Sequence, residues 1–193
     1  MEERPQLLIV GGPNGSGKTT LAIEYADELA LPYVSADAIA ATLNPLNPAA
    51  AEIAAARQFI RAIEANISQK LSFVCESTLS GLTMRNFLAS ARDTGYTVSI
   101  AFLFVESAGV CVARVAERVR AGGHDVPESD IRRRFTRSIR NFWSTYRELA
   151  DSWVLLYNGA MTLEDIAVGA GDQTAVRDSD LFAAFLALVG DLP

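Results

Sequence analysis

The chain has 193 residues, of which 50% are hydrophobic and 21% charged, and its formal net charge at pH 7 is −6. This length and apolar content fit one domain with a full core, and the acidic balance argues against sequence-independent binding to nucleic acid or to acidic membranes. Because the chain has no run of about 18 apolar residues and no signal-peptide pattern, we expect a single cytoplasmic domain over residues 1–193.

A glycine-rich segment near the N-terminus lies between an apolar run and a helical pattern. The run QLLIV precedes GGPNGSGKTT, and apolar residues at four-residue spacing follow. This strand, loop and helix order matches GxxxxGK[ST], in which backbone N–H groups and a helix N-terminus hold phosphates. Lys18 is a candidate catalytic residue at the β- and γ-phosphates of ATP, and Thr19 is a candidate Mg²⁺ ligand. The candidate cofactor-binding residues are Gly12, Pro13, Asn14, Gly15, Ser16, Gly17, Lys18, Thr19 and Thr20, with Arg114 from later in the chain.

Asp37 follows a short apolar strand within LPYVSADAIA, which we expect to end near Ser35. In an open parallel sheet, the carboxyl ends of the strands face the ligand crevice. A carboxylate there can accept the proton of an attacking hydroxyl, so Asp37 is a candidate catalytic base and substrate-binding residue. The alternative is that Asp37 caps the helix that begins with AIAATL.

A carboxylate and several hydroxyl groups follow the next apolar strand, LSFVCES at residues 71–77. Glu76 and Thr78 are candidate substrate-binding residues for the hydroxyls of a sugar or nucleoside. Glu76 is alternatively an indirect contact to Mg²⁺. A further alternative is that ESTLSG only caps the helix expected at residues 82–95.

The remaining apolar segments complete an alternating order of strands and helices. Residues 49–69 have helical spacing, residues 96–105 form the longest and most central strand, and residues 152–158 form the fifth strand. We therefore predict an α/β fold with a doubly wound, five-stranded parallel sheet, that of a nucleoside-kinase-like P-loop NTPase with a helical lid. One terminal helix is expected in DSDLFAAFLALVG.

Positive charge is concentrated in the segment at about 112–149. Between Arg114 and Arg147, nine arginines face four carboxylates, a local excess of +5 (9 − 4). The helical pattern of CVARVAERVR ends at the Gly122-Gly123 pair, and Pro127 begins the next helix. This predicts a helical hairpin that closes as a lid over the nucleotide.

The lid arginines have different predicted roles. Arg118 and Arg134 are candidate catalytic residues that neutralise the transferring phosphoryl group once the glycine hinge closes, and Arg114 is expected to stack on adenine. Arg133 is a candidate substrate-binding residue. The alternative is a solvated face, because residues 132, 133 and 134 point in three directions on a helix. His124, the only histidine, is expected to make a structural hydrogen bond.

The segments GGPNGSGKTT, SADAIA, FVCESTLSG and RVRAGGHDVPESDIRRRF together resemble the zeta toxin family of P-loop kinases, roughly over residues 6–158. The resemblance implies ATP and Mg²⁺ as cofactors, Asp37 as the base, and Glu76 as a substrate-binding residue. It also implies phosphate-binding roles for Arg118 and one arginine of the run 132–134. The acceptor that it implies is UDP-N-acetylglucosamine, and the partner is an antitoxin protein.

These features predict an ATP- and Mg²⁺-dependent phosphotransferase that acts on a hydroxyl of a small acceptor such as a nucleotide sugar. Two alternatives stay open. One is an ATP-binding regulatory or interaction module without an acceptor, and the other is a nucleic-acid end kinase that uses the arginine-rich helix as a backbone track. The acidic net charge favours a small-molecule acceptor, without nucleic-acid or membrane partners.

Overall fold

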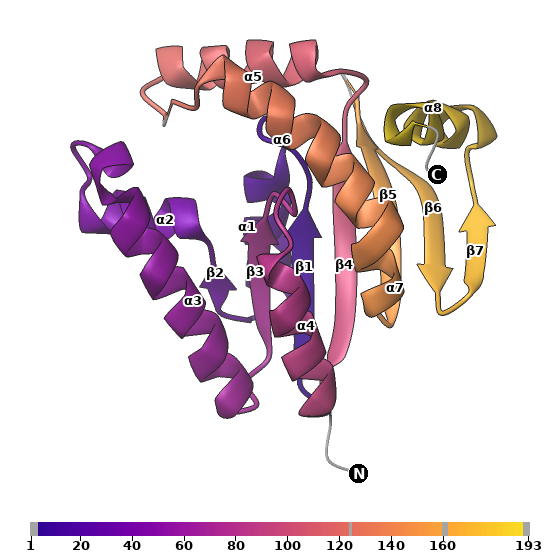
Figure 1. Ribbon diagram of the computed structural model, residues 1–193, viewed down its shortest axis with the longest axis horizontal. Helices are drawn as coiled ribbons and strands as arrows, with labels where there is room; N and C mark the ends of the chain where they lie inside the picture. Colours follow the sequence, from indigo (N-terminus) through magenta and orange to yellow (C-terminus); the bar gives the residue numbers. More distant parts are fainter. Residues whose placement is uncertain (1–3, 124, 160–161, 191–193) are drawn as a thin grey trace.

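The computed structural model describes residues 4–123, 125–159 and 162–190, within which seven strands form one mixed sheet (Figure 1). The strand order is β2-β3-β1-β4-β5-β6-β7. β1–β5 are parallel to one another, β6 pairs with β5 in antiparallel orientation, and β7 pairs with β6 in the same way. The strands are β1 Gln6–Gly11, β2 Tyr33–Val34, β3 Phe73–Ser77, β4 Thr97–Phe104, β5 Ser152–Asn158, β6 Leu163–Ala170 and β7 Gln173–Val176.

The five predicted parallel strands are confirmed as β1–β5. The prediction that the sheet contains five strands is wrong, because the sheet has seven. β6 and β7 extend it as a hairpin that turns at Gly171, whose φ is 55°. The β5–β6 register shifts between Leu155 and Leu156, so the consecutive residues Ile166 and Ala167 are both buried. This bulge breaks the period-2 alternation by which a strand is predicted from sequence.

The two faces of the sheet are covered unequally. α1 Lys18–Glu28 packs on one face, where Leu21 and Ala22 join a core cluster with Val10 and Leu103. The larger cluster lies on the opposite face, in front of the sheet in Figure 1. The helices that contribute to it include α3 Glu52–Ser68, α4 Thr83–Asp93, α6 Glu128–Asn141 and α8 Ser179–Val189.

Of the remaining helical elements, those at residues 36–43, 48–51 and 108–120 lie near the carboxyl ends of the parallel strands, and those at residues 142–149 lead to the start of β5 (Figure 1). These elements are α2 Ala36–Leu43, the 3-10 helix Pro48–Ala51, α5 Ala108–Arg120, the π-helix Phe142–Tyr146 and α7 Arg147–Leu149. α5 and α6 form the predicted helical hairpin, which crosses above these strand ends in Figure 1. Across the described ranges, no helix has both the length and the apolar character that a membrane crossing requires.

α6 is attached to the loop that follows β3. The buried Ser138 hydroxyl donates a hydrogen bond to the Thr78 carbonyl, and Asn141 Nδ2 donates to the Leu79 carbonyl over 2.9 Å. Ile139 on the same helix is fully buried in the core. The second helix of the hairpin is therefore part of the packed domain along its C-terminal half.

Replacement of Ser138 by Ala should lower the free energy of unfolding by about 1–2 kcal/mol, because the Thr78 carbonyl loses its buried donor. Ser144→Ala is the matched control, since that exposed hydroxyl donates to the Arg140 carbonyl of its own helical run and lies 3.5 Å from the adjacent Thr145 hydroxyl. We expect the control to change stability by less than about 0.5 kcal/mol. Urea unfolding of both variants tests this difference, and equal values would contradict the anchoring role.

Candidate active site

The phosphate-binding motif forms the predicted loop between β1 and α1. β1 ends at Gly11, α1 begins at Lys18, and the N-cap Gly17 has a left-handed φ of 94°. The loop also packs closely on β4, since a Cβ added to Gly12 would lie 2.3 Å from the Leu103 carbonyl oxygen. Gly17 must be glycine for its conformation, and Gly12 must be glycine both for its conformation and for the close approach to β4.

Two polar side chains of this loop are buried. Asn14 is 6% exposed and Ser16 is 0% exposed, and within the described part of the chain neither Asn14 Oδ1 nor Ser16 Oγ has a hydrogen-bond partner. Buried polar atoms are normally satisfied, so these two atoms fit a polar ligand at the loop. The adjacent N-terminus of α1 and the Lys18 ammonium suit a phosphate group, and the loop therefore fits the phosphates of ATP.

A buried network centred on Glu76 holds Lys18. The Lys18 Nζ donates to the Pro13 carbonyl over 3.0 Å and lies 3.9 Å from Glu76 Oε1. Thr19 Oγ1 donates to the same carboxylate oxygen over 3.0 Å, and the Tyr33 hydroxyl donates to Oε2. Glu76 thus joins the end of β3 to the loop and to β2.

The charges of this network act on one another. Burial lowers the pKa of Lys18 below its ordinary value, while the negative charges of Glu76 and Asp37 act in the opposite direction. Burial and the Glu76 carboxylate raise the pKa of Tyr33, so its hydroxyl stays protonated as a donor. A bound phosphate would add negative charge beside Lys18 and favour its ammonium form.

The end of β5 holds the loop from another side. Asn158 Nδ2 donates to the Ser16 carbonyl over 2.8 Å. Arg114 Nη2 donates to the carbonyls of Asn158 and Gly159 over 3.0 and 2.9 Å, so it ties α5 to this strand end. Adenine stacking by Arg114 stays a prediction.

Replacement of Asn158 by Ala should weaken ATP binding about fivefold, equivalent to about 1 kcal/mol, because the loop loses one hydrogen bond that fixes its backbone. Isothermal titration of the protein with Mg·ATP measures the change. Gln173→Ala removes an exposed carboxamide on β7 and serves as the control. An unchanged dissociation constant for Asn158→Ala would show that the loop keeps its shape without this bond.

Two small cavities lie against the loop and contain most of the predicted site residues. The first has a volume of about 200 Å³ and the second about 210 Å³. The first is lined by Asn14, Gly15, Gly17, Lys18, Thr19, Thr20, Asp37, Glu76, Arg114 and Arg118. The second shares Asn14, Lys18, Asp37 and Glu76 and adds Ser35, Ala36, Phe59, Ser77, Thr78 and Arg134.

The two helix-capping alternatives are wrong. Asp37 lies in the first turn of α2, and the N-cap is Ser35, whose side chain accepts from the Ala38 N–H over 3.5 Å. α4 has Leu82 at its N-cap and no side-chain cap, so Glu76 does not serve that helix either. Both carboxylates instead line the cavities beside the loop.

The three consecutive arginines of α6 have different surroundings. Arg134 lines the second cavity and lies 3.6 Å from Asp130. Arg133 pairs with Asp130 at 2.9 Å, and Arg132 pairs with Glu128 at 2.7 Å. Of the three, Arg134 alone lines either small cavity. A substrate-binding role for Arg133 stays a prediction.

The glycine pair ends α5 as predicted. Gly122, with φ of 88°, donates to the Val119 carbonyl, and Gly123 donates to the Arg118 carbonyl, each over 2.9 Å. Arg118 lines the first cavity in this arrangement of the hairpin. Hinge movement at the glycines stays a prediction, and His124 lies outside the described residues.

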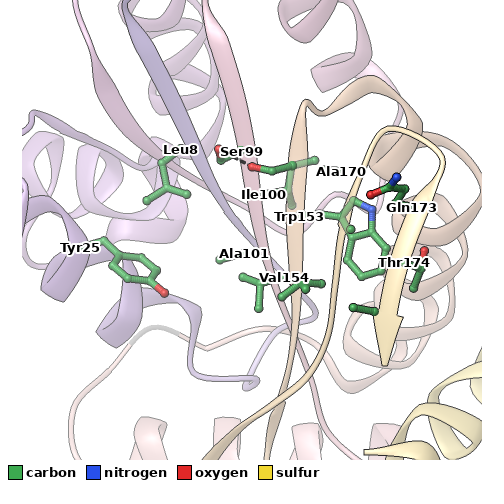
Figure 2. A pocket seen from close by; sticks show the side chains of 14 residues that line it. Leu8, Tyr25, Ser99, Ile100, Ala101, Trp153, Val154, Ala170, Gln173 and Thr174 are labelled. Atoms are coloured by element: carbon green, nitrogen blue, oxygen red, sulfur yellow. Dashed lines mark hydrogen bonds between the residues drawn. The ribbon is translucent and has the colours of Figure 1, made fainter. Parts of the chain in front are cut away.

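A larger cavity, of about 770 Å³, lies on the sheet face that α1 partly covers (Figure 2). Leu8, Tyr25, Ala101 and Val154 are among its lining residues, and none of the residues that line it is acidic or basic. A nucleoside triphosphate needs positive charge and N–H donors. This cavity therefore does not compete with the loop as the nucleotide site.

Sheet, loop and cavities together define a P-loop kinase-like fold. Residues 7–138 match the AAA domain family, and the chain belongs to that family. It is similar to an uncharacterized protein of Haemophilus influenzae, with 34% identity over 124 residues that cover 64% of this chain and 88% of that protein.

Solved structures share the fold at low sequence identity. The crystal structure of AvrRxo1-ORF1:-ORF2 with ATP matches with a TM-score of 0.81 and 15% identity, over 100% of this chain and 66% of that chain. The PezAT toxin-antitoxin system of Streptococcus pneumoniae matches with a TM-score of 0.64 and 12% identity, over 100% of this chain and 81% of that chain. This chain spans 66% of the length of the first matched chain. Membership of the zeta toxin family stays a prediction.

Proposed function

We propose that the protein transfers the γ-phosphate of ATP to a hydroxyl of a small acceptor in the presence of Mg²⁺. One observation carries the proposal: Lys18, Glu76, Asp37 and Arg118 line a single cavity beside the phosphate-binding loop. Cationic groups can hold phosphates at one end of such a site, and a carboxylate can accept a proton at the other.

ATP would be held mainly by the loop and Lys18. The buried Ser16 hydroxyl supports this assignment, because a phosphate oxygen would accept its hydrogen bond. The Thr19 hydroxyl would ligate Mg²⁺, which when bound draws charge from the β- and γ-phosphate oxygens. The phosphates of ATP would supply further ligands.

In the transfer step, the acceptor oxygen forms a bond to the γ-phosphorus while the bond to the β,γ-bridging oxygen breaks and ADP leaves. Asp37 takes the proton of the acceptor hydroxyl. Arg118 and Arg134 neutralise the charge on the transferring group from two sides, and Glu76 and Thr78 stay candidates for contacts with the acceptor.

The acceptor and a protein partner belong to the same proposal. UDP-N-acetylglucosamine, implied by the resemblance to zeta toxins, stays one acceptor to test. An antitoxin-like protein partner is supported by two similar structures, which come from the AvrRxo1-ORF1:-ORF2 complex and the PezAT toxin-antitoxin system.

The two alternative functions are less well supported. A regulatory module without an acceptor leaves a cavity of about 560 Å³ beside Asp37 without a role. A nucleic-acid track along α6 is disfavoured because Arg132 and Arg133 pair with carboxylates of the same helix.

The proposal is tested by incubating the purified protein with Mg·ATP and a metabolite extract and analysing the products by mass spectrometry. We expect a new compound that is heavier than an extract component by one phosphoryl group. Lys18→Ala should abolish its formation. ADP and free phosphate as the only products, with extracts and UDP-sugars alike, would overturn the proposal.

A further inference from the structure

The cavity beside Asp37 has the size of a small-molecule site, at about 560 Å³. It lies between the α2 and α3 end of the domain and the connection from α5 to α6, which face each other on the left of Figure 1. Ala40 and Ala55 on one side and Val126 on the other give it apolar walls. Such walls suit the carbon frame of a small compound.

This cavity continues into the phosphate end of the site. Asn14, Asp37 and Arg134 line both this cavity and the cavity of about 210 Å³ that contains Lys18. A compound held here would therefore present a hydroxyl to Asp37 and to the γ-phosphate. This position makes the cavity the place for the acceptor under the proposed function, on which the following inference rests.

The charge of the cavity is negative. Four carboxylates line it against one guanidinium, a formal sum of −3 (1 − 4). Its carboxylates are Asp37, Glu52, Asp125 and Asp130, and its guanidinium is that of Arg134. Asp130 pairs with Arg134 at 3.6 Å and with Arg133, which is not a lining residue, at 2.9 Å, so the sum is −2 (2 − 4) when Arg133 is included. No lysine is among the lining residues. A phosphate or carboxylate group on the acceptor would therefore meet negative charge at the rim of the cavity.

A buried acceptor atom points to the same kind of ligand. Asn14 is 6% exposed and lines the cavity, and its Oδ1 has no hydrogen-bond partner among the residues that the structure describes. An amide oxygen accepts hydrogen bonds, which hydroxyl and ammonium groups donate. A bare phosphate oxygen cannot satisfy it.

We propose that the acceptor is a small hydroxyl compound without phosphate or carboxylate groups, either uncharged or positively charged. This assignment replaces the nucleotide sugar that the resemblance to zeta toxins implies, because the diphosphate of that acceptor would lie among the carboxylates of the rim. The γ-phosphate of ATP is then the anionic group that the site admits, at the end that Lys18 and Arg118 line.

A fractionated metabolite extract tests the assignment. The extract is passed over an anion-exchange resin, and ADP formation by the full chain is measured with Mg·ATP plus either the unretained or the retained fraction. We expect the unretained, neutral and cationic fraction alone to stimulate ADP formation. Stimulation by the retained fraction alone, or equally by both, would overturn the assignment while the proposed function stands. If neither fraction stimulated ADP formation, the proposed function itself would be contradicted.

A charge-reversed variant tests whether the rim causes the selection. Glu52 and Asp125 are exposed, and replacing both by Lys changes the formal charge of the lining from −3 to +1 (−3 + 4). The preference for the unretained over the retained fraction should fall at least about tenfold. Asp172→Lys, at an exposed turn, should keep the wild-type preference. If the double variant kept the wild-type preference for the unretained fraction, the charge of the rim would not be the cause of that preference.

Discussion

Replacement of Asp37 by Asn should lower the rate of phosphoryl transfer to the acceptor by about 10²–10⁴-fold, the contribution of a general base. Asn keeps the size and polarity of the side chain but cannot take the proton of the acceptor hydroxyl. The dissociation constant for ATP should stay within about twofold, since Glu76 still accompanies Lys18. Single-turnover transfer and equilibrium titration with ATP measure the two quantities.

The matched control is Asp180→Asn. Asp180 occupies the first turn of α8 as Asp37 occupies the first turn of α2, so both substitutions remove the same interaction with a helix N-terminus. We expect the control to transfer phosphate at the wild-type rate. If Asp37→Asn also kept that rate while Lys18→Ala abolished it, Asp37 would not be the base.

Loss of Arg118 or Arg134 should raise the barrier to transfer by about 2–4 kcal/mol each, the size of a single electrostatic stabiliser. Each guanidinium lines one of the small cavities that contain Lys18. The charge that they neutralise is greatest as the γ-phosphoryl group moves. ATP affinity should therefore change much less than the turnover rate, and both are measured for Arg118→Ala and Arg134→Ala.

Arg132→Ala is the control for this pair. Arg132 is a neighbour of Arg134 on α6, but its side chain is 54% exposed and pairs with Glu128. Its loss should leave turnover near the wild-type value. Equal small effects at all three positions would mean that the arginines form a solvated face, and the roles given to Arg118 and Arg134 would be wrong.

The sequence predicts the parts of the site that depend on local order along the chain. The glycine loop follows from strand, loop and helix signals that are adjacent in sequence. Asp37 and Glu76 follow from one rule, that polar residues after parallel strands gather at one edge of the sheet. The same rule finds Asn158, the last residue of β5, if it is applied to that strand.

Other parts depend on tertiary placement. Tyr33 reaches Glu76 because β2 pairs with β3 in one register, which no local pattern contains. The choice of Arg134 over Arg132 and Arg133 depends on how α6 is rotated against the core, where Ile131 and Phe135 are buried. β6 is not predicted from the sequence, because its bulge breaks the alternation of buried and exposed residues that marks a strand.

The fate of the γ-phosphate tests the central proposal most directly. The protein is supplied with Mg·ATP that carries ³²P in the γ-position, together with an unfractionated metabolite extract. We expect the label to appear in an organic phosphate ester in equal amount to the ADP formed, and Asp37→Asn to suppress that ester. Label recovered as inorganic phosphate alone, with ADP formed at the same rate in the presence and absence of the extract, would contradict a kinase with a small-molecule acceptor.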